Sequence, residues 1–191
     1  KPPTIIVDHF NASNFGKALL FTPPNWGKSI IWDEPGGSMN MIPLNKQNGD
    51  FIAIQRFFPI FKSEEACIVY VKPTDRLNDK WNVKKVIDLP FVHRIGIVNN
   101  GNVNFLVAST LCGGKNYIDD WSRPGAVYVC PIPDNPDDKW VLKPILEGIS
   151  KNHGMHITRF QNQQVVFVSG EEGVFKIQVP TNMNDSWVYE K

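Results

Sequence analysis

Two histidines, His93 and His153, stand at matching points of two similar stretches of the sequence. The span from His93 to Ser109 is as long as the span from His153 to Ser169, and each ends in an apolar run followed by serine. Neutral imidazole nitrogens are good ligands for divalent transition metals. If the two stretches lie side by side, His93 and His153 could share a divalent metal ion (Zn, Mn or Mg). The alternative is that each histidine bonds backbone carbonyls at a tight corner.

Met39 occupies the same slot in an earlier repeat, and its thioether is a weak ligand. This chain therefore offers two candidate metal ligands, and a catalytic zinc site would need a third from elsewhere. His156 lies three residues beyond His153, so strand alternation turns it to the other side and predicts a packing role.

Polar residues near the predicted ends of other strands are candidates for catalysis. Asp8, His9 and Glu171 are candidate bases, and the sequence does not rank them. Arg94, next to His93, is the candidate that would stabilise a developing oxyanion, with Arg56 as its alternative. Such groups around one site are suited to binding and transforming hydroxylated or carboxylated small molecules.

The candidate substrate-binding residues come from a strand end and from one long loop. Gln55 and Arg56 end a predicted strand. The loop over 110–125 is long for a compact fold, and such loops are often functional. Its candidates are Trp121, as a stacking platform for a sugar ring, with Asp120 and Arg123 as hydrogen-bonding groups. The alternative is a loop that packs on the neighbouring repeat.

These residues can share a site only if the elements that carry them converge. A tryptophan after an Asp-, Asn- or Pro-rich turn recurs at about 50-residue intervals, which is typical of propellers and solenoids. The four instances are Trp26, Trp81, Trp140 and Trp187. Each is expected to open a strand and to be structural, as a large ring at a corner with its indole N–H bonded to a nearby turn.

Between the tryptophans, short apolar runs rich in Val, Ile and Phe are bounded by Gly, Pro, Asn and Asp, which predicts strands rather than helices. The whole chain, 1–191, is expected to form a single all-β domain of repeated antiparallel units. These are a partial unit of three strands over 1–38 and four-stranded units over about 39–92, 93–152 and 153–191.

Four-stranded antiparallel units of this length predict the blades of a β-propeller. We name the strands of a blade inner, second, third and outer, counted from the central channel. In a propeller, the loop from an outer strand to the next inner strand lies on the same face as the loop from second to third strand. Residues that begin inner strands and end second strands therefore converge at one mouth of the channel.

Three complete blades and a partial one are few for a closed ring, because propellers have about four to eight blades. Three arrangements are open: a longer chain that completes a ring of about seven blades, a second copy that completes the ring, and an irregular four-bladed ring. The first is favoured, because Lys191 ends the chain in mid-strand.

Composition narrows the partners. With 20 basic and 19 acidic residues the net charge is +1, which gives no field to hold a nucleic acid. No apolar stretch approaches the about 18 to 20 residues that span a bilayer, so no membrane partner is expected. The three cysteines are odd in number and irregularly spaced, which favours reduced thiols and a cytoplasmic protein. A secreted, already cleaved chain remains an alternative.

The stretch Asn152-His153-Gly154-Met155-His156-Ile157, followed by 165–170 and 173–177, resembles the blade pattern of VCBS/FG-GAP-like β-propellers. The parallel stretch from His93 to Ser109 extends the resemblance through the repeats. It is most similar to the propeller of aldos-2-ulose dehydratase and its bacterial relatives. The resemblance implies a divalent metal near His93 and His153 and, in some members, dehydration or isomerisation of a keto-sugar.

One feature of that family is missing. The turns at 99–102 and 161–164 carry only Asn, Gly and Gln, whereas family blades often carry an Asp-rich calcium-type turn there. Calcium prefers charged oxygen ligands, so we do not expect it in these turns.

Two functions of different classes follow. The first is a metal-assisted carbohydrate lyase, dehydratase or isomerase, in which the ion polarises a carbonyl or carboxylate and a nearby base removes the acidified proton. The second is a non-catalytic propeller that binds a sugar or a protein, with structural histidines.

Overall fold

The structure, a computed structural model, describes residues 5–8, 16–45, 48–58, 62–182 and 185–191. Over these ranges the chain is all-β, with fifteen strands and one short 3-10 helix, η1 (Ser63–Glu65). The described ranges contain no helix with the length and apolar character needed to cross a bilayer.

The strands form four antiparallel sheets, each connected in chain order. Sheet 1 consists of β1 (Ile5–Asp8), β2 (Ala18–Thr22) and β3 (Gly27–Trp32). Sheet 2 consists of β4 (Met41–Asn45), β5 (Asp50–Gln55), β6 (Cys67–Lys72) and β7 (Asn82–Asp88). Sheet 3 consists of β8 (Val92–Asn99), β9 (Asn104–Thr110), β10 (Gly125–Pro131) and β11 (Lys143–Ile149). Sheet 4 consists of β12 (Gly154–Phe160), β13 (Gln163–Gly170), β14 (Gly173–Gln178) and β15 (Val188–Glu190). The predicted grouping of three strands, then four, four and four, is confirmed.

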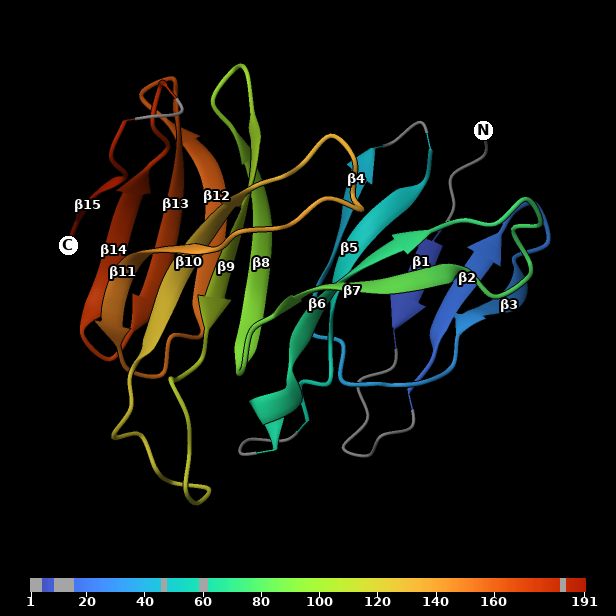
Figure 1. The fold of residues 1–191 in the computed structure, drawn as a ribbon, viewed down its shortest axis with the longest axis horizontal. Helices are drawn as coiled ribbons and strands as arrows, with labels where there is room; N and C mark the ends of the chain where they lie inside the picture. Colours follow the sequence, from blue (N-terminus) through green and yellow to red (C-terminus); the bar gives the residue numbers. More distant parts are fainter. Residues whose placement is uncertain (1–4, 9–15, 46–47, 59–61, 183–184) are drawn as a thin grey trace.

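Neighbouring sheets pack face to face in chain order, from sheet 1 at one side of the molecule to sheet 4 at the other (Figure 1). A separate apolar cluster fills each interface, because strand alternation gives the sheets two apolar faces. Ile31 and Val69 meet between sheets 1 and 2. Ile54 and Leu106 meet between sheets 2 and 3, and a third cluster fills the space between sheets 3 and 4.

Each interface also contains a tryptophan from the loop that precedes the last strand of a sheet. Trp81 packs in the cluster shared with sheet 1, Trp140 in the cluster shared with sheet 2, and Trp187 against the cluster shared with sheet 3. The indole Nε1 of Trp81 donates to Leu77 O at 3.0 Å, and that of Trp140 donates to Pro136 O at 3.3 Å. The structural role predicted for these three residues is confirmed.

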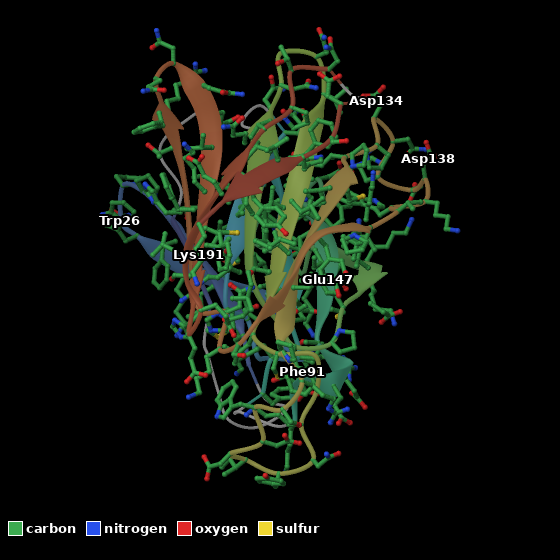
Figure 2. All side chains as sticks on the ribbon, turned by 90° about the vertical axis from the view of Figure 1, so that its left-hand side faces the viewer. Trp26, Phe91, Asp134, Asp138, Glu147 and Lys191 are labelled. Atoms are coloured by element: carbon green, nitrogen blue, oxygen red, sulfur yellow. The ribbon has the colours of Figure 1, made fainter. Side chains whose placement is uncertain are left out.

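Two predictions about the tryptophans are wrong. Trp140 does not open a strand, since β11 begins three residues later at Lys143 and Trp140 lies in the loop. Trp26 is not packed between sheets: it lies in the tight β2–β3 turn with a φ of 53°, and its side chain is 48% exposed at the edge of the molecule (Figure 2). The repeat places Trp26 in the same kind of loop, but no described sheet precedes sheet 1.

The first strands of the complete sheets, β4, β8 and β12, lie next to one another. β8 is an edge strand of sheet 3, and side-chain amide oxygens from sheets 2 and 4 accept hydrogen bonds from its free edge. Ile95 N donates to Asn40 Oδ1 at 3.1 Å, and Asn99 N donates to Gln164 Oε1 at 2.7 Å. A Cβ on Gly96 would lie 2.2 Å from Cδ1 of Ile157, so glycine permits the close approach of β8 and β12.

The connections that contain the candidate site residues lie at one end of the sheets. The loop over 111–124, η1 and the turns that lead into β8 and β12 lie at the lower end in Figure 1. Phe91, just before β8, lies near the same end in Figure 2. The starts of first strands and the ends of second strands therefore share one end of the molecule, as predicted.

Replacement of Trp140 by alanine should lower the free energy of unfolding by about 3 to 5 kcal/mol, because it removes a large buried ring and leaves a cavity between sheets 2 and 3. Tyr117→Ala is the control, since that side chain is 63% exposed. It should change the free energy by less than about 0.5 kcal/mol. Urea denaturation followed by circular dichroism measures both, and similar losses would contradict the packing role of Trp140.

Candidate functional site

The same backbone turn leads into the first strand of each complete sheet. Its defining residue lies in the left-handed region, with φ values of 75°, 59° and 48° at Gly37, Phe91 and Lys151. Two residues later stand Met39, His93 and His153, so the predicted equivalence of these slots agrees with the backbone. A positive φ is unfavourable for Phe and Lys, and such strain often accompanies functional sites.

His93 lies in a β-bulge that turns its side chain toward neighbouring sheets. Val92 pairs with Thr110 and Arg94 pairs with Ser109, which leaves His93 as the extra residue. Its ring centroid is 5.1 Å from that of Phe57, which follows β5 of sheet 2, and 4.4 Å from that of His153, just before β12 of sheet 4. The structure thus brings His93 and His153 into contact.

The two histidines differ in environment, since His93 is only 2% exposed and His153 is exposed. Burial above all, together with the charges of Arg94 and His153, lowers the pKa of His93 to about 3. A hydrogen bond to the backbone of His153 acts in the opposite direction, as expected when the imidazole donates to a carbonyl. His93 is therefore a neutral imidazole at pH 7.

Three buried polar atoms on His93 and on segments that adjoin it have no hydrogen-bond partner among the described residues. They are Nδ1 of His93, Oγ of Ser109 and Oδ1 of Asn152. Ser109 and Asn152 are fully buried, and the Asn152 amide Nδ2 already donates to Ala126 O at 3.4 Å. A buried polar atom without a hydrogen-bond partner lowers the free energy of unfolding by about 1 to 3 kcal/mol. Three such atoms together are therefore a substantial cost to stability.

The three atoms belong to adjoining segments. Ser109 pairs with Arg94, next to His93, and lies on the face of β9 that packs on sheet 4. Asn152 immediately precedes His153, and its backbone N donates to Leu111 O at 3.2 Å. Nδ1 of a neutral imidazole that donates through Nε2 is an acceptor, and Oδ1 of Asn152 is also an acceptor. This group of atoms, which we call the acceptor cluster, requires hydrogen-bond donors.

Gln55 and Arg56, predicted to bind substrate, lie apart from the acceptor cluster. Gln55 is buried and its Nε2 is unpaired, but it follows Phe51 and Ala53, which pack on sheet 1. The equivalent Ser109 faces sheet 4 instead. Arg56 has a φ of 63° and forms an exposed ion pair with Glu65 at 2.6 Å.

Of the candidate bases, the structure describes the side chain of Glu171 alone. Glu171 is exposed and forms an ion pair with Lys151. Asp8 ends β1, and His9 lies outside the described residues. The packing role predicted for His156 is wrong, since its side chain is exposed. Arg94 is half-buried beside His93, which places it nearest of the candidate catalytic residues.

The 111–124 loop is held together by its own buried charges. Lys115 and Asp120 are each 3% exposed. Lys115 Nζ donates to Ile118 O at 2.9 Å and to Asp120 O at 3.0 Å. Hydrogen bonds from Ser122 and the backbone of Asn116 lower the pKa of Asp120 to about 2. Asp120 therefore holds the loop together rather than facing a substrate.

Trp121 and Arg123 are also engaged within this region. The ammonium of Lys115 lies 3.2 Å from the ring centroid of Trp121, so it covers one face, and that of Lys151 lies 5.4 Å away. Arg123 donates to Asn116 Oδ1 at 3.2 Å. The loop contacts the start of sheet 4 through Lys151, and Trp121 does not present two open faces for stacking.

The described residues supply an incomplete set of ligands for a metal ion. In the described part of the chain, no group of three or more His, Cys, Asp and Glu is placed to hold a metal ion. Two imidazoles on one tetrahedral ion have ring centres about 5 Å apart, slightly more than the 4.4 Å between His93 and His153. The pair could supply two ligands after a small movement, but the described residues supply no third.

Neither a family model nor a curated protein nor a solved structure matches this chain.

Sequence reasoning missed Asn152 and Phe57 as neighbours of His93. Asn152 directly precedes His153, so its place in the repeat could have identified it as a candidate site residue. Phe57 follows a residue with positive φ, and no sequence feature predicted the change of face that brings it to His93.

The buried imidazole of His93 should make stability fall with acidity. The unfolded chain binds a proton at His93 below about pH 6.5, whereas the native state does so only near pH 3. Between these values the free energy of unfolding should therefore decrease by at most about 1.4 kcal/mol per pH unit from this group.

Denaturation between about pH 7 and pH 4 checks this sign. His93→Gln should flatten the pH dependence, and His156→Gln, at an exposed side chain, should leave it unchanged. Identical slopes for wild type and His93→Gln would show that His93 titrates normally in the native protein.

Proposed function

We propose that this chain forms part of a β-propeller and binds a hydroxylated small molecule, such as a sugar, at the channel mouth beside His93 and His153. The face-to-face packing of four antiparallel sheets and the adjacency of β4, β8 and β12 support the propeller. So does the resemblance of the repeats to VCBS/FG-GAP-like propellers.

The acceptor cluster is the observation that carries the proposal. Asn152 Oδ1 only accepts hydrogen bonds, the Ser109 hydroxyl can both accept and donate, and His93 Nδ1 accepts in the tautomer that carries its proton on Nε2. A sugar hydroxyl is both donor and acceptor, so adjacent hydroxyls could satisfy all three atoms. The exposed ring of His153 lies against His93 and would be displaced to admit the ligand.

Binding fits the arrangement better than catalysis does. The candidate base Glu171 is paired with Lys151, and Arg56 is paired with Glu65. General base catalysis requires a group within hydrogen-bonding reach of the proton that it removes, and none of the three atoms of the acceptor cluster belongs to a carboxylate. We therefore favour the non-catalytic alternative.

The keto-sugar D-fructose is the probe for this proposal. Its addition should shift the imidazole NMR signals of His93 and His153, with saturation below about 100 mM. Ser109→Ala removes one polar contact and should weaken binding by about tenfold. Ser29→Ala, in sheet 1, is the matched control and should bind like wild type. No imidazole shift with fructose or with D-glucose would contradict the proposal.

A metal-assisted carbohydrate lyase or isomerase is the second candidate, favoured by the contact of a neutral His93 with His153. A bound divalent ion would polarise a substrate carbonyl. His93 and His153 would hold it, and Arg94 would lie beside the substrate oxygen.

Calorimetric titration with Zn²⁺ tests this second candidate separately. It predicts one ion per chain, binding that is lost in His153→Ala, and binding that is retained in His156→Ala. Absence of one-to-one binding to the wild type would exclude the metal-assisted reaction and leave the sugar-binding proposal standing.

A further inference from the structure

The three occupied interfaces between sheets have a common construction. The loop before the last strand of one sheet contributes a tryptophan to the face of the preceding sheet, as at Trp81, Trp140 and Trp187. These loops share a turn in which an Asp N–H donates three residues back, to Arg76 O, Asn135 O and Asn182 O. The loops also bond the last strand of the preceding sheet. Trp81 N donates to Ile31 O at 2.8 Å, and Lys84 pairs with Asp137 at 2.5 Å.

Sheet 1 presents the same kind of face with nothing described upon it. Ala18 and Leu20 of β2 pack on sheet 2, so strand alternation turns Leu19 and Phe21 to the opposite face. Ile30, paired with Leu19, is 37% exposed there. Trp26, in the loop before the last strand of this sheet, is 48% exposed. Of the four recurring tryptophans, Trp26 is the one with no preceding sheet among the described residues.

Sheet 4 presents the complementary face at the other side of the molecule. Val166 and Val168 pack on sheet 3, and the opposite face of β13 carries Phe167. On the neighbouring strands this face continues with Phe160, Val174 and Val188, which are 46%, 57% and 56% exposed. The ion pair of Lys176 with Glu190 lies on the same face, and the ammonium of Lys176 lies 5.0 Å from the ring centroid of Phe160. Exposed apolar side chains bordered by charged ones are typical of an interaction surface.

We infer that the outer face of sheet 4 in one copy of the chain packs on the outer face of sheet 1 in a second copy, with Trp26 inserted as Trp81 and Trp140 are in their interfaces. This contact continues the interfaces already present between consecutive sheets. A head-to-tail contact must either close into a ring or grow into a filament. Two copies supply eight sheets, which lies within the range of about four to eight blades in closed propellers, and the inference includes closure on two copies.

The inference uses the propeller architecture of the proposed function but not its ligand. Reciprocal packing would cover both apolar end faces of each copy and leave no open sheet face. It would also surround the ends of β4, β8 and β12 with the equivalent strands of the partner, which completes the channel beside His93.

The mass of the chain in solution tests the inference. Light scattering after size exclusion should give twice the 21.7 kDa of one chain. A mass of 21.7 kDa, or a series of larger oligomers, would overturn the closed dimer. Trp26→Asp should yield a monomer, and Tyr117→Asp, at a side chain that is 63% exposed and outside both faces, should remain dimeric.

A second variant distinguishes this contact from simple misfolding. Val174→Asp alters only the sheet 4 face and should also give a monomer with an unchanged circular dichroism spectrum. When the two variants are mixed, one intact interface can form between them, so they should associate although neither does so alone. If the mixture stays monomeric while wild type is dimeric, the head-to-tail contact is wrong. Fructose binding by the monomeric Trp26→Asp variant reports on the ligand proposal independently.

Discussion

The insertion of one tryptophan from each of sheets 2, 3 and 4 into the interface with the preceding sheet is the interaction on which the remaining structure depends. Trp81 and Trp140 bury a large apolar ring while their indole N–H groups bond the loops that carry them. Because the loop also bonds the last strand of the preceding sheet, each sheet is held in one orientation relative to its neighbour. The first strands are then brought together at one side of the sheets, and His93 reaches His153.

The site combines this packing with local strain. The left-handed residue before each first strand and the bulge at His93 direct one imidazole into the space between sheets. Burial keeps that imidazole neutral, and its Nδ1 has no partner in the described part of the chain. Both effects oppose stability, and the apolar clusters on either side offset them. A ligand that donates hydrogen bonds would supply these buried atoms with partners, so ligand binding should stabilise the folded protein.

The sheets could be predicted from the sequence because two signals agree. The tryptophan interval marked the repeat, and short apolar runs bounded by turn residues marked the strands. The contact of His93 with His153 was also predictable, since both follow the same turn. The faces to which the side chains of β5 in sheet 2 point were not predicted. The repeat aligns Gln55 with Ser109, yet these side chains face opposite neighbouring sheets, because a shift of one residue reverses the faces of a strand.

The long loop was predicted to meet a substrate through Asp120, Trp121 and Arg123. In the structure Lys115, Asp120 and Trp121 contact one another within the loop, and Trp121 also packs against the apolar cluster between sheets 2 and 3. Composition alone does not distinguish charges that face a ligand from charges that stabilise a loop. Trp26 shows the same limit, since the repeat identifies the residue but not whether a sheet lies before it.

The most direct test of the account is a double-mutant cycle between Phe105 of sheet 3 and Trp187 of sheet 4, whose rings meet edge to face at 5.6 Å. Phe105→Leu, Trp187→Leu and the double variant would be compared with wild type by equilibrium unfolding. If the tryptophans join consecutive sheets, the coupling free energy should be about 0.5 to 1.5 kcal/mol. Additive effects of the two substitutions would contradict the contact and the arrangement of sheets built on it.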